Sequence, residues 1–113
     1  MSSDAVICGY VRSAFTPAKK GGLAKVRPDD LAAGVVNGLI KKYKINVDDV
    51  EDLILGCAFP EAEQGMNLAR NVVFLSDLPK SVGGVTVNRF CASSMQAIHQ
   101  AAGAIVSGSG ELF

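Results

Sequence analysis

The sequence predicts an α/β fold whose strands and helices follow one another in the order β-α-β-α-β-α. Short apolar runs recur at residues 5–11, 53–59 and 84–88, and each is too short for a typical helix. Longer stretches with apolar residues at helical spacing follow each run, and glycine, proline or acidic residues separate the segments. Alternation of this kind is typical of a parallel sheet connected by helices.

The first strand is predicted at Ala5–Val11, which is apolar at nearly every position, as in strands buried on both faces. A loop with Lys19, Lys20, Lys25 and Arg27 follows. We interpret these charges as solvent-exposed, and contact with an anionic ligand or a neighbouring subunit is the alternative.

The first helix is predicted to open at Pro28, because proline is tolerated in a first turn and the acidic residues that follow it complement the helix dipole. Apolar side chains at near-helical spacing continue to Tyr43. The second strand is predicted at Leu53–Phe59 and the second helix at Gly65–Leu75. Its apolar face consists of Leu68, Val72 and Leu75.

The third strand is predicted at Gly84–Asn88, and the third helix from Phe90 to Val106 or Ser107. This helix has small or apolar residues on every side, which indicates burial on every side by further layers of protein. The residues after Ser107 form a turn followed by Leu112 and Phe113, which we interpret as the opening of a fourth strand.

Composition restricts the class of protein. The 113 residues are 49% hydrophobic, enough for one small domain with a core. Eleven basic and eleven acidic residues give no net charge, which argues against nucleic acid or an anionic membrane as a partner. No membrane-spanning segment or secretory signal is found, and the odd, widely spaced cysteines indicate reduced thiols in a cytoplasmic protein with no metal site.

Cys91 is the candidate nucleophile, because it lies where a strand-to-helix turn becomes helix. Unpaired backbone N–H groups and the helix dipole stabilise a thiolate there. A buried structural thiol is the alternative for Cys91, and it is the interpretation for Cys8 and Cys57, which lie in the predicted strands.

No partner for Cys91 is evident in the sequence. His99, the only histidine, lies eight residues further along the same helix, about 12 Å in rise and about 80° in rotation. A base must come within about 3 Å of the proton that it takes. Asp77 and Glu63 remain possible bases, and Asn88 and Arg89 either bind substrate or hold the turn.

Several motifs resemble the thiolase family. The segment Val85–Ala97, which reads VTVNRFCASSMQA, resembles the thiolase nucleophile motif, above all that of degradative 3-ketoacyl-CoA thiolases (acetyl-CoA acyltransferases). Val11–Phe15, Lys20–Leu23, Arg27–Leu31 and Glu63–Arg70 resemble further family motifs in the same order. Within this motif, Ser94-Met95 stands where many thiolases have Gly-Leu, and it is similar to the Ser-Met of the thiolases of bacterial fatty-acid oxidation complexes.

The resemblance implies fatty-acid β-oxidation chemistry: thiolytic cleavage of 3-ketoacyl-CoA to acetyl-CoA and a shortened acyl-CoA, through a thioester on Cys91. Coenzyme A is then a co-substrate, and no tightly bound cofactor is expected. The family's two catalytic histidines and second cysteine lie far C-terminal, and Cys8, Cys57 and His99 do not match them. The CoA-binding loops also lie beyond residue 113, so no CoA contact is assigned.

The complete thiolase fold has α-β-α-β-α layers, and the resemblance implies that residues 1–113 are part of its N-terminal domain, ending before the fourth strand. The chain alone is expected to be inactive and to need the remainder of the enzyme, in a homodimer or homotetramer with the strand before Cys91 at the dimer interface. The alternatives are a non-catalytic module that binds acyl-CoA or a partner subunit, an acetoacetyl-CoA thiolase and, less favoured, a ketoacyl synthase.

Overall fold

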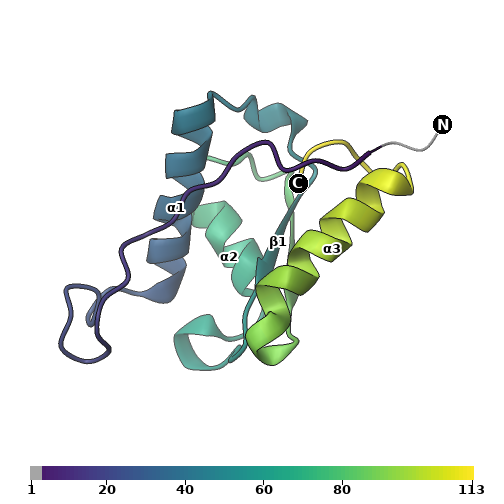
Figure 1. Cartoon of the computed structure of the whole chain (residues 1–113). Helices are drawn as coiled ribbons and strands as arrows, with labels where there is room; N and C mark the ends of the chain where they lie inside the picture. Colours follow the sequence, from purple (N-terminus) through teal and green to yellow (C-terminus); the bar gives the residue numbers. More distant parts are fainter. Residues whose placement is uncertain (1–3) are drawn as a thin grey trace.

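The structure is a computed structural model that describes residues 4–113. Five regular elements follow one another in the order α-β-α-β-α (Figure 1): α1 at Pro28–Tyr43, β1 at Asp52–Gly56, α2 at Leu68–Leu75, β2 at Gly83–Val87 and α3 at Ser93–Val106. Single turns of 3₁₀ helix occupy Val47–Asp49 (η1), Ala62–Gln64 (η2) and Phe90–Ala92 (η3).

The two strands pair in parallel, with Asp52 beside Gly83 and Gly56 beside Val87. The predicted α/β class with a parallel sheet is therefore confirmed. β1 ends at Gly56, before the predicted end at Phe59, because the backbone there leaves the sheet for the η2 loop.

Helices cover both faces of this small sheet. On one face, the backbone N–H of Ala69 in α2 donates to Thr86 Oγ1 at 3.0 Å, and Gly84 lies directly under the α2 backbone at Arg70. On the other face, Gly56 lies against the first residues of α3. Leu53 pairs with Gly84 and therefore lies on the face that α2 covers. Gly56, three residues further along β1, lies on the opposite face because successive residues of a strand alternate between faces.

The core lies between α1, α2 and the first face of the sheet. It contains two groups of buried side chains that share the half-buried neighbours Val36 and Leu53. The first group is Ala33, Cys57, Leu68 and Val72, and the second is Val73, Leu78 and Val82. Leu68 and Val72 thus occupy the predicted apolar face of the second helix, whereas Leu75 is exposed.

The second helix begins at Leu68 rather than at the predicted Gly65. Asn67 caps it, because its side-chain oxygen accepts the N–H of Arg70 at 3.3 Å. Met66 has a φ of 61°, a left-handed conformation that cannot continue a right-handed helix.

The prediction of a strand at Ala5–Val11 is wrong. The segment forms no strand and crosses in front of the other elements (Figure 1), and Val6, Ile7 and Tyr10 expose 72%, 77% and 77% of their surface. The Tyr43 hydroxyl instead accepts the Tyr10 N–H at 3.3 Å, at the end of α1. Apolar sequence forms a strand only where a neighbouring strand offers its backbone groups, and none does so here.

α3 buries only Ser93 and Ala97, and its apolar Met95, Ile98 and Val106 are exposed. Burial of this helix on every side, by further chain or by another subunit, therefore stays a prediction. One expectation changes at the C-terminal end. Leu112 and Phe113 form no strand; the Leu112 carbonyl accepts a single hydrogen bond, from the Glu51 N–H at 2.9 Å.

None of the helices formed by residues 4–113 combines the length and the apolar character that crossing a bilayer requires.

Candidate active site

Cys91 is exposed in the turn that joins β2 to α3. β2 ends at Val87, two residues without regular structure follow, and Cys91 is the middle residue of η3, directly before α3. The helix thus begins with a 3₁₀ turn, and α3 itself starts at Ser93 rather than at the predicted Phe90. The thiol nevertheless lies at the predicted place, at the N-terminal end of this helix.

Two side chains close the turn around Cys91. The Asn88 side-chain oxygen accepts the Phe90 N–H at 2.8 Å. The Ser93 hydroxyl accepts the Arg89 N–H at 2.9 Å and donates to the Phe90 carbonyl oxygen at 2.6 Å. Of the two sequence interpretations for Asn88, these contacts are those of a residue that holds the turn.

The backbone of the turn is unusual at Phe90, whose φ is 47°. An L-residue with a side chain rarely adopts this left-handed conformation, because its Cβ approaches the following carbonyl oxygen. Strained conformations of this kind persist where surrounding contacts hold them, and they are frequent at functional sites.

The turn rests on the C-terminal end of β1. A Cβ added to Gly56 would lie 2.4 Å from the Ser94 backbone nitrogen, so only glycine permits this approach. The next residue, Cys57, donates its N–H to the Val87 carbonyl at 3.0 Å. Cys57 is buried, as predicted, but Cys8 is exposed, because the N-terminal segment lies outside the sheet; the prediction of a core position for Cys8 is wrong.

The structure brings none of the candidate bases to Cys91 through a described contact. His99 is exposed on α3, beyond the reach that the helix geometry allows. Asp77 follows the C-terminal end of α2, where its N–H donates to Asn37 Oδ1 at 2.8 Å. That end of α2 leads into the start of β2, whereas Cys91 follows the opposite end of the strand.

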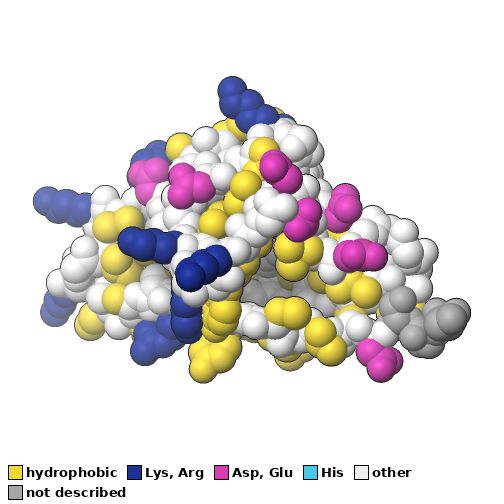
Figure 2. Space-filling model, turned by 90° about the horizontal axis from the view of Figure 1, so that it is seen from above, with side chains coloured by type: hydrophobic (Ala, Val, Ile, Leu, Met, Phe, Trp, Pro, Cys, Tyr) yellow, Lys and Arg dark blue, Asp and Glu magenta, His cyan; other side chains and the backbone are white. Residues whose placement is uncertain are grey.

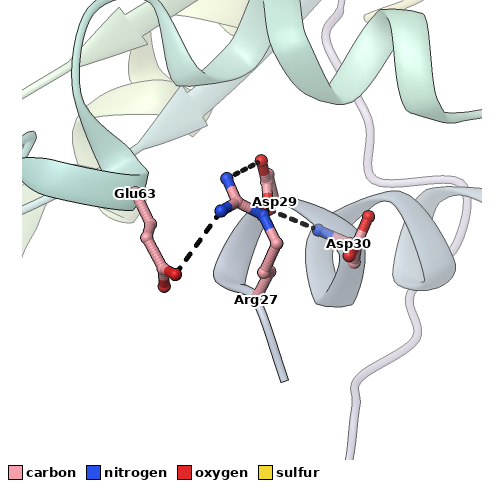
Figure 3. Close-up of polar contacts among 4 residues, drawn as sticks. All are labelled: Arg27, Asp29, Asp30 and Glu63. Atoms are coloured by element: carbon pink, nitrogen blue, oxygen red, sulfur yellow. Dashed lines mark hydrogen bonds and ion pairs between the residues drawn. The ribbon is translucent and has the colours of Figure 1, made fainter. Parts of the chain in front are cut away.

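Glu63 has a structural partner instead (Figure 3). Arg27 Nη1 lies 3.4 Å from Glu63 Oε1, which ties η2 to the start of α1. The same guanidinium binds both carboxylate oxygens of Asp29, at 3.0 Å and 2.8 Å. These hydrogen bonds hold the pKa of Asp29 below its ordinary value and raise that of Arg27. The guanidinium of Arg27 therefore forms ion pairs with Asp29 and Glu63, whereas the lysines of its loop are exposed.

Ser93 and Phe90 were not identified from the sequence. A serine directly after a strand-to-helix turn is a signal that could have identified Ser93, since serine hydroxyls satisfy free backbone groups at helix starts. The left-handed Phe90 has no comparable signal, because aromatic residues do not favour that conformation.

Within residues 4–113, no group of three or more histidine, cysteine or acidic side chains is placed to hold a metal ion. A mainly apolar groove of about 470 Å³ lies between residues 11–13 and α1, lined by Arg12 and Asp30 at its polar positions. No residue of the Cys91 turn lines it.

The fold and the site together describe an α/β protein with a parallel sheet and an exposed cysteine at the start of a helix. The chain belongs to the thiolase family: residues 5–113 match the family model described as thiolase, N-terminal domain. It is 51% identical over 110 residues to a 3-ketoacyl-CoA thiolase of Acinetobacter baylyi. Proteins of the same name from Acinetobacter baumannii (strain ATCC 17978) and a Psychrobacter species are 50% and 46% identical. Each match covers 97% of this chain but only 28% of the relative.

Proposed function

We propose that this chain forms the N-terminal part of an acyltransferase that cleaves 3-ketoacyl-CoA with coenzyme A. The observation that carries the proposal is the 51% identity, over nearly the whole chain, to a protein named 3-ketoacyl-CoA thiolase. The exposed Cys91 at the start of a helix supports the same assignment, because that position favours a thiolate nucleophile.

In the proposed reaction, the Cys91 thiolate attacks the keto carbon of the substrate. The bond between the keto carbon and the neighbouring carbon breaks, and its electron pair leaves with acetyl-CoA, which takes up a proton. The shortened acyl group stays on Cys91 as a thioester. The thiol of coenzyme A then loses its proton to a base, attacks the thioester carbon and releases the Cys91 thiolate. Covalent catalysis of this kind divides one difficult step into two easier ones.

The proposal assigns only the nucleophile to residues 4–113. The bases that move protons and the contacts with coenzyme A are assigned to sequence equivalent to the rest of the relatives, of which this chain spans 28%. We further propose that residues 1–113 are part of the thiolase N-terminal domain, ahead of its fourth strand, and that the complete enzyme is a homodimer or homotetramer. A role in fatty-acid β-oxidation, without a tightly bound cofactor and in the cytoplasm, belongs to the same proposal.

A chimera tests the assignment directly. Residues 5–113 replace the matching segment of the Acinetobacter baylyi 3-ketoacyl-CoA thiolase, and thiolysis of a 3-ketoacyl-CoA is measured. We expect the chimera to be active and Cys91→Ala to lower its kcat by at least about 10³-fold, because no other group in this segment replaces the thioester-forming thiol.

Cys8→Ser is the matched control, because Cys8 is also an exposed thiol but lies in the N-terminal segment. It is expected to leave the rate unchanged. A chimera that keeps full activity after Cys91→Ala would exclude Cys91 as the nucleophile. A folded chimera with no activity before substitution would favour the non-catalytic binding module.

A further inference from the structure

The turn that carries Cys91 contains more hydrogen bonding than a connection between strand and helix requires. The Ser93 hydroxyl pairs with two backbone groups of the turn, the Arg89 N–H and the Phe90 carbonyl, and that carbonyl also accepts the backbone N–H of Ser93. Its side chain is well shielded, since only 4% of the residue is exposed. Polar groups that are removed from water in this way are costly to leave unpaired, so these bonds are strongly favoured.

Both side chains converge on one residue. Asn88 binds the N–H of Phe90, and Ser93 binds its carbonyl oxygen, so the peptide groups on either side of Phe90 are held. Phe90 is also the residue with the left-handed φ of 47°. Phe90 is 67% exposed, so burial of this residue does not account for its conformation.

We propose that Ser93 is a positioning residue for Cys91, and that it acts together with Asn88 by holding Phe90 in the left-handed conformation. Phe90 immediately precedes Cys91, so its backbone angles set the direction in which the Cys91 side chain leaves the turn. The held turn keeps the thiol at the N-terminal end of α3, where the helix dipole favours the thiolate. The catalytic meaning of this role rests on the proposed function, but the geometric effect on the thiol does not.

The test measures alkylation of Cys91 by iodoacetamide in the 113-residue chain. Cys8→Ser provides the background, because it leaves Cys91 as the exposed thiol while Cys57 is buried. Ser93→Ala is expected to slow labelling about threefold, the size of a helix-terminus effect on a charge. Ser94→Ala is the matched control, since it removes the same hydroxyl from the neighbouring residue, which is exposed.

A second substitution separates positioning from general damage to the fold. Glycine adopts a positive φ without steric cost. In Phe90→Gly, residue 90 can therefore take the left-handed conformation without the hydrogen bond from Ser93. The double variant Phe90→Gly/Ser93→Ala is therefore expected to label within about twofold of the parent, although it has lost the same hydroxyl. A residue that served only stability would not be rescued in this way.

Ser93 is buried, so unfolding of Ser93→Ala is monitored by circular dichroism. If that variant does not fold, Asn88→Ala, at an exposed position, removes the other hydrogen bond, and Asn88→Ser keeps an acceptor oxygen. Equal labelling rates in the parent and in the Ala variant, equal slowing by Ser94→Ala, or failure of Phe90→Gly to restore the rate would each overturn the proposal. Loss of thiolysis in the chimera with intact rescue of labelling would overturn the proposed function alone.

Discussion

Asp52, at the first position of β1, is the residue whose carboxylate fits its surroundings least well. Its Oδ1 atom is buried and has no hydrogen-bond partner among the described residues. Gly83 lies beside it in the sheet, and a Cβ there would come within 2.8 Å of this same oxygen. Removal from water raises the pKa of Asp52 above its ordinary value, because burial disfavours the charged form.

The raised pKa predicts how Asp52→Asn changes stability with pH. A group whose pKa is raised by folding stabilises the protein when protonated, and that contribution is lost as the pH rises through the folded-state pKa. We therefore expect Asp52→Asn to raise the free energy of unfolding at neutral pH by less than about 1 kcal/mol, since water still reaches part of the side chain. Below about pH 3, the Asp52 carboxyl is protonated and neutral in both the folded and the unfolded protein, so this gain in stability disappears.

Urea titrations at several pH values measure this difference. Asp49→Asn is the control, because Asp49 is an exposed aspartate of the neighbouring η1 turn and should show no such gain at neutral pH. A loss of stability in Asp52→Asn at neutral pH would show that the carboxylate has a donor in solution.

At the scale of elements, the contact between β1 and α3 supports the turn that carries Cys91. α3 approaches the sheet closely at Gly56, where backbone of the helix occupies the space that a side chain would need. The Cys91 turn and the first turn of α3 therefore share one support. The residues that form this contact are small on both sides, in keeping with the small side chains along α3.

Gly56→Ala is expected to displace the start of α3, because the new Cβ would lie 2.4 Å from the Ser94 nitrogen and backbone cannot rotate away. Forced packing of this kind typically costs about 1–3 kcal/mol. Thermal unfolding measures the loss. Gly103→Ala, in α3 but with open space around the new methyl group, should instead stabilise the helix by up to about 1 kcal/mol. Equal effects of the two substitutions would contradict the close contact.

At the scale of the molecule, apolar side chains remain on the surface. Figure 2 shows yellow hydrophobic groups beside charges of both signs, around a hollow near the middle of this face. The most exposed large apolar residues are Phe15 and Met66, and α3 adds Met95 and Ile98. Extensive apolar surface is uncommon on a self-sufficient monomer and fits a chain that spans 28% of its relatives.

The exposed face of α3 predicts that the folded chain binds the dye 1-anilinonaphthalene-8-sulfonate. Replacing both Met95 and Ile98 by lysine should lower the dye fluorescence by about half, since apolar surface of this kind is what the dye detects. The double variant Ser94→Lys/Gln100→Lys adds the same charge at exposed polar positions of α3 and is expected to change the signal little. Equal losses in both variants would mean that charge, rather than apolar surface, governs dye binding.

Local patterns were enough to predict much of the fold and the position of Cys91 at the start of a helix. Each of these patterns involves only residues that are close together in the sequence. They are the proline and acidic residues at the start of α1, the apolar spacing of α2, and the short apolar runs of β1 and β2. All of them predicted the right kind of element. Cys91 was found for the same reason, because the change from strand to helix can be read from the sequence around it. That position is an observation, and its catalytic role remains the proposal.

Tertiary structure decided what depends on distant partners. Ala5–Val11 has the composition of a strand but no strand beside it, and without a partner its backbone groups gain nothing from that geometry. The pairing of Arg27 with Glu63, the exposure of Cys8 and the buried oxygen of Asp52 likewise arise from segments far apart in the chain. By itself, the sequence determined the kind of element formed by α1, β1, α2, β2 and α3, and the position of Cys91 in the turn before α3. Only the folded chain showed the hydrogen bonds of Ser93 within the Cys91 turn and the close approach of Gly56 to α3, because hydrogen bonds and close contacts depend on three-dimensional distance.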